Sequence, residues 1–362
     1  MAKHYPGKAW RRGHEAMARI KEKRATVHDL ARAAGVSLAT VDRVLNRRPG
    51  VRPATISRVE AAIEALDFRR DVPASLLARA RAINVTVLLP DGENSFMANL
   101  SAAIEEEGRR RAAERLQITA QRVRAFDGGA LARTIDALTR ENCDCAIVVA
   151  TDAEEVRAAV ERAALRGIEV VTLVSDIPES RRRHFVGIDN LAAGRTAAAL
   201  LGRFCGEGAR IGLIAGSLAL RDHQQRLQGF RETVRGKFPG LRLVGPLEGH
   251  DNAAETAVAA ERLIAENDDL EGLYSLGAGN SGLVAALHRT GRAGKLRVVA
   301  HELTKTTRQG LKDGAIDVIL DQNPQGEVRA ALEIARQIGL GSYPLPEPFT
   351  IELGIFFAEN LR

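Results

Sequence analysis

Aromatic residues are scarce in this 362-residue sequence, at 4% of the chain, and only three cysteines are present. No stretch approaches the ~18–20 consecutive apolar residues that a membrane-spanning helix needs, and no secretory signal peptide opens the chain. The low cysteine count predicts a reducing, cytoplasmic location. These absences argue against a membrane protein, an exported protein and a disulfide-rich secreted domain.

Metal-binding and catalytic patterns are also missing from the sequence. Cys143 and Cys145 lie at an apolar strand with no nearby histidine or second cysteine pair, so we interpret them as core residues. No cluster of serine, histidine and aspartate points to a nucleophile. We therefore expect no metal, no cofactor and no enzyme activity.

Basic residues are concentrated at the N-terminus. Residues 1–82 hold 18 Lys and Arg against eight Asp and Glu, a net charge of +10, whereas the rest of the chain carries −4. A basic fifth on a mildly acidic body is typical of one DNA-binding module. The length allows two or three domains, and a 45% hydrophobic content supports large cores.

Residues 26–46 predict two short helices joined by a tight turn. Thr26 is a candidate N-cap for the first helix, Gly35 allows a left-handed turn, and Ser37 is a candidate N-cap for the second. This arrangement is typical of a helix-turn-helix, whose second helix enters the DNA major groove. A helical hairpin without a DNA role is the alternative.

The flanking segments are basic as well. A third helix is expected from about Ala54 to Leu66, after a basic turn that contains Arg52. Residues 1–24 lack sustained periodicity, which predicts a disordered arm that adds phosphate contacts, or a mis-assigned start codon.

Residues 25–82 resemble the headpiece of the lactose-repressor (LacI/GalR) family of bacterial transcription factors. The matching residues are AGVS at 34–37, TV at 40–41, RVLN at 43–46, GVRPAT at 50–55 and ALDF at 65–68. The resemblance implies a homodimer on pseudo-palindromic operator DNA. The residues expected at the DNA are Thr26, Ser37, Leu38, Ala39, Thr40, Asp42, Arg43, Asn46, Arg52 and Leu77.

Within this set the resemblance assigns different roles. Leu38 and Ala39 would face base edges, and Ser37 and Asn46 would anchor backbone phosphates. Asp42 replaces the serine that is usual in the family. It could accept a hydrogen bond from cytosine N4 or form a salt bridge to a neighbouring arginine, and both interpretations stay open.

Residues 72–80 resemble the hinge helix of the same family. The resemblance implies that Leu77 wedges into a central base step from the minor groove, which would kink the duplex. A plain flexible linker is the alternative.

From Ile83 onward, strand candidates alternate with amphipathic helices. The strands are expected at 83–89, 117–123, 145–149, 169–174, 184–187, 211–215, 241–247, 272–275, 297–300 and 316–320. The alternation predicts an α/β domain with two parallel sheets covered by helices on both faces. The stretch resembles the type I periplasmic sugar-binding fold.

The expected organisation is an all-α helix-turn-helix unit at 25–71, a hinge at 72–82 and a two-lobed effector and dimerisation domain at 83–362. Lobe 1 is expected at about 83–188 and 324–345, and lobe 2 at about 189–322 and 348–362. Ligands of open α/β folds bind beyond the carboxyl ends of strands, so a small sugar or polyol effector is expected between the lobes.

Polar and aromatic residues recur just after these strands. Amides, carboxylates and arginines around an aromatic ring are what a polyhydroxylated ligand requires, although each one alone could be a solvated loop residue. The candidate effector-binding residues are Asn94, Phe96, Ser175, Asp176, Asn190, Arg221, Arg226, Asn280, Glu302 and Gln322.

One motif favours an enzyme. Residues 277–282, GAGNSG, follow a strand and precede a helix, as in a dinucleotide-binding loop. A nicotinamide-dependent dehydrogenase is therefore an alternative, and a transporter's solute-binding protein is another. The favoured hypothesis is an effector-responsive transcription factor, most simply a repressor.

Overall fold

The computed structural model describes residues 25–45, 50–66, 68, 82–92, 94–341 and 351–361. The predictions for the arm at 1–24, for the hinge helix with Leu77, and for Asn46 lie outside these residues. The chain divides into an N-terminal helical unit and an α/β unit that begins at about residue 81. Each unit is described by itself.

The N-terminal unit consists of α2 (Val27–Ala34), α3 (Leu38–Leu45) and α4 (Pro53–Ala65). Thr26 caps α2 because its hydroxyl accepts the N–H of Asp29 at 3.3 Å while the Asp29 carboxylate accepts the N–H of Thr26 at 2.9 Å. Gly35 follows at φ +61°. These contacts confirm the predicted helices and turn.

A small apolar core holds the three helices together. Its fully buried members, Leu30, Val41 and Val59, come one from each helix. Ser37 caps α3, where its Oγ accepts the N–H of Thr40 at 3.2 Å. Burial of one face of α3 leaves the opposite face open to solvent.

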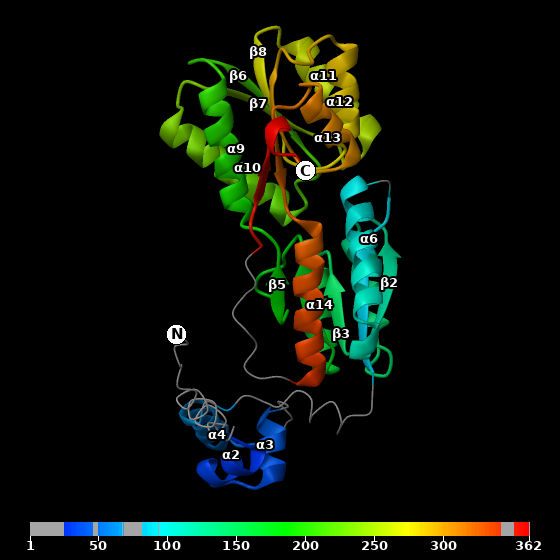
Figure 1. The fold of residues 1–362 in the computed structure, drawn as a ribbon, viewed down its shortest axis with the longest axis vertical. Helices are drawn as coiled ribbons and strands as arrows, with labels where there is room; N and C mark the ends of the chain where they lie inside the picture. The colour runs from blue at the N-terminus through cyan, green and yellow to red at the C-terminus, as the bar shows by residue number, and fades with distance from the viewer. Residues whose placement is uncertain are drawn as a thin grey trace, which may run out of the picture. The chain divides into compact units, whose positions relative to one another are not determined.

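The α/β unit contains two sheets, and the first has the strand order β2-β1-β3-β4-β5 with every pair parallel. Its strands are β1 (Ile83–Pro90), β2 (Leu116–Val123), β3 (Cys145–Val148), β4 (Glu169–Leu173) and β5 (His184–Val186). Its helices are α6 (Ser95–Arg110), α7 (Gly128–Asp136), α8 (Glu154–Leu165) and α14 (Pro324–Leu340). A short 3-10 helix, η1 (Ala112–Glu114), follows α6. We call this group lobe 1 (Figure 1).

Helices cover the central strands of lobe 1, so β1, β3 and β4 are mostly buried, whereas the edge strand β2 is largely exposed. Helices α7 and α8 share one apolar cluster with β1, β3 and β4. Helices α6 and α14 lie side by side, although more than two hundred residues separate them in sequence (Figure 1). Arg111 and Glu333 join them at 2.9 Å. Cys143 and Cys145 are fully buried in this lobe.

The second sheet has the order β11-β10-β9-β8-β6-β7 and is parallel except at β10–β11. Its strands are β6 (Arg210–Ala215), β7 (Arg242–Glu248), β8 (Leu270–Ser275), β9 (Arg297–His301), β10 (Val318–Asp321) and β11 (Gly354–Phe356). Its helices are α9 (Asn190–Phe204), α10 (Arg221–Lys237), α11 (Ala253–Glu266), α12 (Asn280–Arg289) and α13 (Lys305–Lys312), and η2 (Ala358–Asn360) follows β11. We call this group lobe 2.

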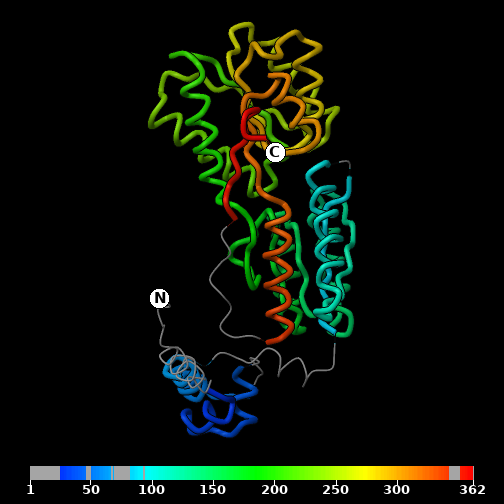
Figure 2. The backbone as a smooth tube through the Cα atoms, in the orientation of Figure 1, coloured from blue at the N-terminus to red at the C-terminus, as the bar shows by residue number. Residues whose placement is uncertain are grey.

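Helices cover both faces of the second sheet. Helices α9 and α10 pack on one face, and α11, α12 and α13 pack on the other. The chain passes from one lobe to the other after β5 and again after β10 (Figure 2). The two-lobed α/β class is therefore confirmed. Strand β11 corrects the expectation of purely parallel sheets, because this three-residue edge strand runs antiparallel to β10.

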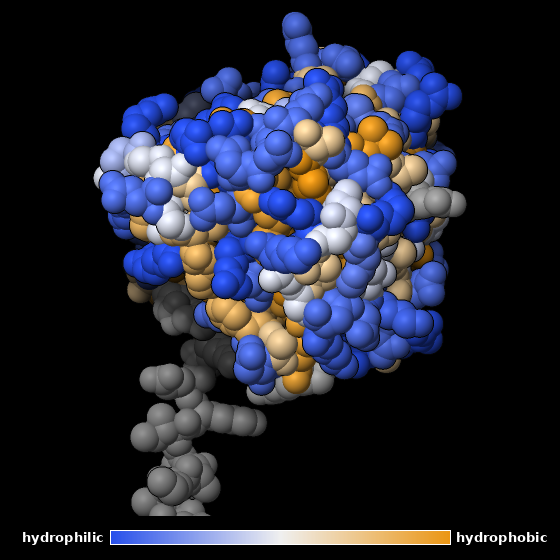
Figure 3. Space-filling view, turned by 90° about the horizontal axis from the view of Figure 1, so that it is seen from above, coloured by the Kyte–Doolittle hydropathy of each residue, from blue (hydrophilic) through white to orange (hydrophobic). Residues whose placement is uncertain are grey.

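The face of the protein seen in Figure 3 is mostly hydrophilic, with apolar groups in small separate patches. Among the described residues, no helix is long and apolar enough to cross a membrane. No group of three or more histidine, cysteine, aspartate or glutamate residues forms a metal-ligand set in the described part of the chain.

Candidate functional site

A cavity of about 240 Å³ lies where the carboxyl ends of the strands of the two lobes meet. Its lining comes from the segments that follow β1, β2, β3 and β4 in lobe 1 and β6, β7, β8, β9 and β10 in lobe 2. Parallel strands end at the same edge of a sheet, so residues far apart in sequence converge there. This is the position expected for a ligand site between two lobes.

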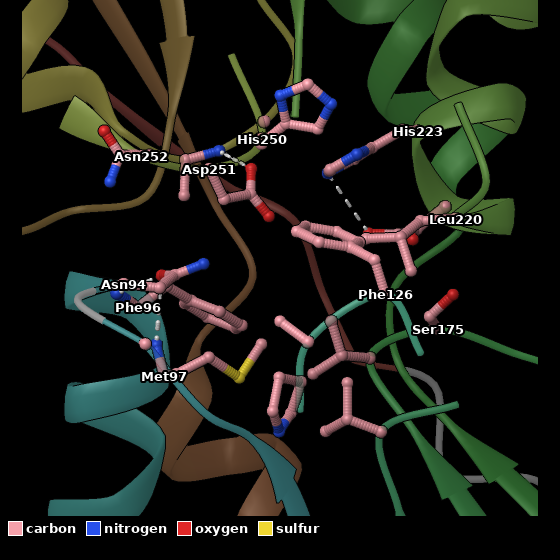
Figure 4. A pocket seen from close by; sticks show the side chains of 18 of the residues that line it. Asn94, Phe96, Met97, Phe126, Ser175, Leu220, His223, His250, Asp251 and Asn252 are labelled. Carbon is pink, nitrogen blue, oxygen red and sulfur yellow. Dashed lines mark hydrogen bonds and ion pairs between the residues drawn. The ribbon is translucent and has the colours of Figure 1, made fainter. Parts of the chain in front are cut away.

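Lobe 1 supplies much of the apolar wall. Phe96 is 3% exposed at the start of α6, next to Met97, and Phe126 reaches in from the loop after β2. Figure 4 shows the ring of Phe126 directed towards His250 and Asp251 of lobe 2. Asn94 caps α6, because its Oδ1 accepts the N–H of Phe96 at 2.9 Å. An apolar wall of this kind suits the faces of a sugar ring.

Arg226 is the central cation of the cavity. It is 1% exposed on α10. Its Nε donates to Oδ1 of Asn190 at 2.9 Å, and its Nη1 donates to the carbonyl of Leu276 at 2.9 Å. Its Nη2 has no hydrogen-bond partner, and Asp222 Oδ2 lies 4.0 Å away. A buried guanidinium held on two sides therefore keeps one donor for a ligand.

Glu302 and Gln322 form the next part of the wall. The Nε2 of Gln322 donates to Oε1 of Glu302 at 2.6 Å, while Glu302 Oε2 and the amide oxygen Oε1 of Gln322 have no hydrogen-bond partner. Burial, together with the nearby Asp321 carboxylate, raises the pKa of Glu302 to about 8. Ser175 Oγ is also buried without a partner.

Several predicted residues do not line the cavity. Asn190 instead holds Arg226, and Asn280 lies behind the wall, where it donates to the carbonyl of His301 at 2.9 Å. Asp176 forms an ion pair with Arg182. Arg221 lies 3.5 Å from Asp152. Asn94, Phe96, Ser175, Arg226, Glu302 and Gln322 do line the cavity.

Sequence reasoning missed Phe126, His250 and Asp251. They follow β2 and β7, so the rule that ligand residues succeed strands could have found them. The ring centroids of Phe126 and His250 lie 6.3 Å apart with a 72° interplanar angle, which makes this pair a contact between the lobes. The Arg221–Asp152 ion pair is a second contact of this kind.

Backbone strain concentrates at the cavity. Eight described residues other than glycine have positive φ, and five of them line the cavity: Phe126, Val174, His250, Asp251 and Glu302. The left-handed region is unfavourable for these side chains, above all for β-branched Val174 at φ +67°. Such strain clusters at ligand sites, where the surrounding structure enforces a particular direction of the side chains.

The glycines of the GAGNSG motif are explained by close packing. A Cβ on Gly282 would lie 1.7 Å from the carbonyl oxygen of Ala253, and one on Gly279 would lie 2.3 Å from Thr256 Oγ1. These glycines let α12 approach α11. The dinucleotide-binding alternative is therefore not favoured.

In the described part of the N-terminal unit, the predicted DNA-binding residues are exposed or half-buried. Leu38 opens α3 with 42% of its surface exposed. The other exposed members are Thr26, Ser37, Ala39, Arg43 and Arg52, whereas Thr40 and Asp42 are half-buried. Leu38, Ala39 and Arg43 are the exposed members that lie on α3 itself.

Comparisons with known proteins agree with this geometry. Residues 85–342, more than two thirds of the chain, match the family described as periplasmic binding protein domain. The chain belongs to this family. Residues 26–71 match the bacterial regulatory proteins of the lacI family, so a lacI-family unit precedes the periplasmic binding protein domain.

Curated relatives match one part or the other. Catabolite control protein A of Priestia megaterium is 43% identical over 81 residues, which cover 22% of this chain and 24% of that protein. The chain thus spans about a quarter of the length of that relative. The D-ribose/D-allose-binding protein of Pseudomonas aeruginosa is 24% identical over 222 residues, 59% of this chain and 68% of that protein.

Solved structures resemble the periplasmic binding protein domain. A solute-binding protein of an ABC transporter from Burkholderia graminis, solved with D-arabinose, is similar with a TM-score of 0.72 and 22% identity over 78% of this chain and 97% of that one. A solute-binding protein from Actinobacillus succinogenes, solved with D-allose, is similar with a TM-score of 0.68 and 18% identity. The match covers 76% of this chain and 98% of that one. These likenesses establish the fold.

Proposed function

We propose that this protein is a sequence-specific DNA-binding transcriptional regulator whose operator affinity is changed by a small sugar or polyol. The observation that carries the proposal is that one chain combines a DNA-binding type of unit with a ligand-binding type of domain. A lacI-family unit with an exposed second helix is joined to a periplasmic binding protein domain whose cavity keeps unpartnered polar atoms. One part suits DNA, and the other suits a small ligand.

The chemistry of the cavity supports a polyhydroxylated effector. Five buried atoms of its lining have no hydrogen-bond partner: Ser175 Oγ, Asp222 Oδ1, Arg226 Nη2, Glu302 Oε2 and Gln322 Oε1. An unpaired buried polar group costs roughly 1–3 kcal/mol, so a ligand that satisfies several of them gains affinity. Hydroxyl groups suit this mixture because each one both donates and accepts.

The positions and contacts of the lining residues support a specific role for each. Arg226 binds a ring or hydroxyl oxygen, Glu302 and Gln322 bind hydroxyls, and Phe96 stacks on the sugar face. Asn190 and Asn280 act as positioning residues behind the wall. Asn94 and Ser175 contribute at the lobe 1 side.

Control of DNA binding works by linkage. The effector contacts both lobes, so it favours one arrangement of them, and that arrangement changes the spacing of the hinge segments in a dimer. The protein acts in the cytoplasm as a homodimer on a pseudo-palindromic operator, where Leu38, Ala39 and Arg43 read or approach the bases and Leu77 wedges into the minor groove.

The proposed protein has a DNA-binding unit, a hinge and two lobes with the following limits. The helix-turn-helix unit spans 25–71 and the hinge spans 72–82. Lobe 1 spans about 83–188 and 324–345, and lobe 2 spans about 189–322 and 348–362. The connections after β5 and after β10 allow the lobes to close around a ligand.

The test begins with the full-length protein and fragments of its own genomic DNA. Bound fragments are sequenced, and affinity for an enriched fragment is then measured with and without D-ribose, D-allose, D-arabinose and their polyols. We expect a pseudo-palindromic site and an affinity change of about tenfold or more with at least one compound. Failure to enrich any site, or the same affinity with every compound, contradicts the proposal.

A further inference from the structure

The cavity contains more acidic than basic side chains. Its described lining includes one arginine, Arg226, and no lysine. The lining carboxylates are Asp91, Asp222, Asp251, Glu255 and Glu302. A cavity with this composition repels anions and attracts cations.

Some of these carboxylates already have partners. Glu255 Oε2 lies 2.7 Å from His250 Nδ1, and Asp251 Oδ1 accepts the N–H of Ala278 at 2.7 Å. Asp222 shares Oδ2 between Arg226 at 4.0 Å and His223 Nε2 at 3.6 Å. These contacts leave the deepest carboxylates incompletely compensated.

The uncompensated oxygens lie on buried groups. Asp222 and Glu302 are each 4% exposed, and Asp222 Oδ1 and Glu302 Oε2 have no hydrogen-bond partner. Glu327, in the first turn of α14, is fully buried, and neither of its oxygens has a partner. Three buried carboxylates therefore share one buried guanidinium, that of Arg226.

Removing a carboxylate from water without a counter-charge is unfavourable, so Glu302 and Glu327 favour the protonated form. Burial and the nearby Asp321 carboxylate raise the pKa of Glu302 to about 8. Burial and the Glu302 carboxylate raise the pKa of Glu327 well above its usual range. A ligand cation removes the need for a proton because it supplies the missing positive charge.

An amino group also matches the unpartnered atoms better than a hydroxyl. An ammonium presents three N–H donors, whereas a hydroxyl presents one. Charge-assisted hydrogen bonds are roughly twice as strong as neutral ones. Asp222 Oδ1 and Gln322 Oε1 are acceptors in the wall that lack donors, and Glu302 Oε2 becomes a third when the ligand cation displaces its proton.

We infer that the cavity takes a positively charged, aminated sugar or polyol in preference to its neutral counterpart. The inference rests on the proposed function, because it specifies the ligand of the same cavity. Anionic sugars, including sugar phosphates, are disfavoured by the same carboxylates. The apolar wall of Phe96 and Phe126 receives the carbon skeleton, and the acidic wall receives the amine.

Matched pairs of compounds test the inference with the full-length protein. Calorimetric titrations compare D-glucosamine with D-glucose and N-acetyl-D-glucosamine, D-galactosamine with D-galactose, and D-glucamine with D-sorbitol. D-Glucose 6-phosphate serves as the anionic member. We expect at least one amine to bind about tenfold or more tightly than its neutral and acetylated counterparts. Glucose 6-phosphate should bind more weakly than glucose.

Two isosteric variants locate the preference. Asp222→Asn and Glu302→Gln keep the size of the side chains but remove a carboxylate, so each should reduce the ratio of amine to neutral affinity by about fivefold or more. Glu255→Gln is the matched control at the cavity, because His250 already engages that carboxylate, and it should reduce the ratio less.

The outcomes separate this inference from the proposed function. Neutral sugars that bind as tightly as their amines, or an unchanged ratio in both variants, overturn the inference and leave an effector-controlled regulator standing. An absence of binding by every compound, together with an operator that responds to none of them, overturns both.

Discussion

The Arg226 side chain is nearly removed from water, yet it keeps one nitrogen without a hydrogen-bond partner. Asn190 and the Leu276 carbonyl fix its direction. We predict that Arg226→Met weakens binding of the effector by about 100-fold, because a charge-assisted hydrogen bond and its alignment are both lost. Calorimetric titration with the compound of highest affinity measures the loss.

Arg235 provides the control for this change. It lies on the same helix, α10, but its side chain is exposed, so Arg235→Met should alter effector affinity less than about twofold. Far-ultraviolet circular dichroism checks that both variants are folded. An Arg226→Met protein that is folded and binds the effector normally would remove Arg226 from the site.

Glu302 gives the stability of the protein a pH dependence of known sign. The folded pKa of about 8 lies above the usual value of 4.5, so the folded state binds more protons than the unfolded state between these values. The associated stability is complete below about pH 4.5 and is lost as the pH rises through about 8. The loss is of order 2–5 kcal/mol, and Glu327 acts in the same direction.

A neutral isostere tests this dependence. Glu302→Gln cannot ionise, so its thermal midpoint should fall less than that of the native protein between about pH 5 and about pH 8.5. The two curves would be parallel if Glu302 kept an ordinary pKa. The charged or polar groups that face Glu302 and remain in the variant are Asp222, Arg226, Asp321, Gln322 and Glu327.

At the scale of residues, the sequence predicted the kinds of side chain in the cavity better than it predicted which individual residues line it. Arg226, Glu302 and Gln322 could be found because they directly follow strands or lie near a helix start. Val174 and Phe126 could not, because their left-handed backbone is imposed by tertiary contacts and not by local preference. Asn190 follows a strand too, but its side chain turns to Arg226 and not to the cavity.

At the scale of elements, the close packing of α9 on α10 positions the cation of the cavity. A Cβ on Gly194 of α9 would lie 2.0 Å from the carbonyl oxygen of Arg226. Gly194→Ala must therefore push the helices apart and displace both Arg226 and Asn190. We predict a loss of about 1–3 kcal/mol in stability, as for other overpacked sites, and at least tenfold weaker effector binding.

A substitution at a second glycine distinguishes the effect of helix packing from the effect of helix propensity. Gly236 lies in α10 with ordinary helical backbone, and a Cβ added there would have no neighbour within 4 Å. Gly236→Ala should therefore stabilise the protein by about 0.5–1 kcal/mol. Denaturant unfolding and effector titration measure both variants. Equal effects of the two alanines would refute the account of α9 and α10 packing.

The order of elements was readable from the sequence because buried parallel strands form apolar runs, and the helices between them carry one apolar face. The first and last residues of the strands and helices could be predicted less accurately. Strand β10 begins at Val318, two residues later than expected, because Ile316 packs in the α12–α13 core instead. Strand β11 was missed, since three residues at a sheet edge give no alternating pattern.

At the scale of the whole molecule, the division of charge and the two family matches agree. The basic N-terminal residues 1–82 contain the lacI-family match at 26–71, and the acidic remainder contains the periplasmic binding protein domain. What the sequence could not give is the arrangement of the lobes around a ligand, because that depends on contacts between residues more than a hundred positions apart, such as Phe126 with His250.

The Arg221–Asp152 ion pair lets the proposed linkage between lobes and DNA be tested without changing the cavity lining. It joins α10 of lobe 2 to the loop after β3 in lobe 1, with the two side chains 35% and 15% exposed. A pair of this exposure contributes about 0.2–1 kcal/mol to the arrangement in which the lobes touch. Arg221→Gln should therefore weaken effector binding by about two- to fivefold.

Linkage adds a sign to this prediction. Suppose that the effector favours the same arrangement of the lobes as the ion pair does. Arg221→Gln then weakens that arrangement in the protein without effector. Its operator affinity must therefore change in the direction opposite to the change that the effector causes. Arg157→Gln is the matched control, because Arg157 pairs with the same Asp152 from within lobe 1. A shift in the same direction as the effector's, or equal shifts in both variants, would contradict control through the two lobes.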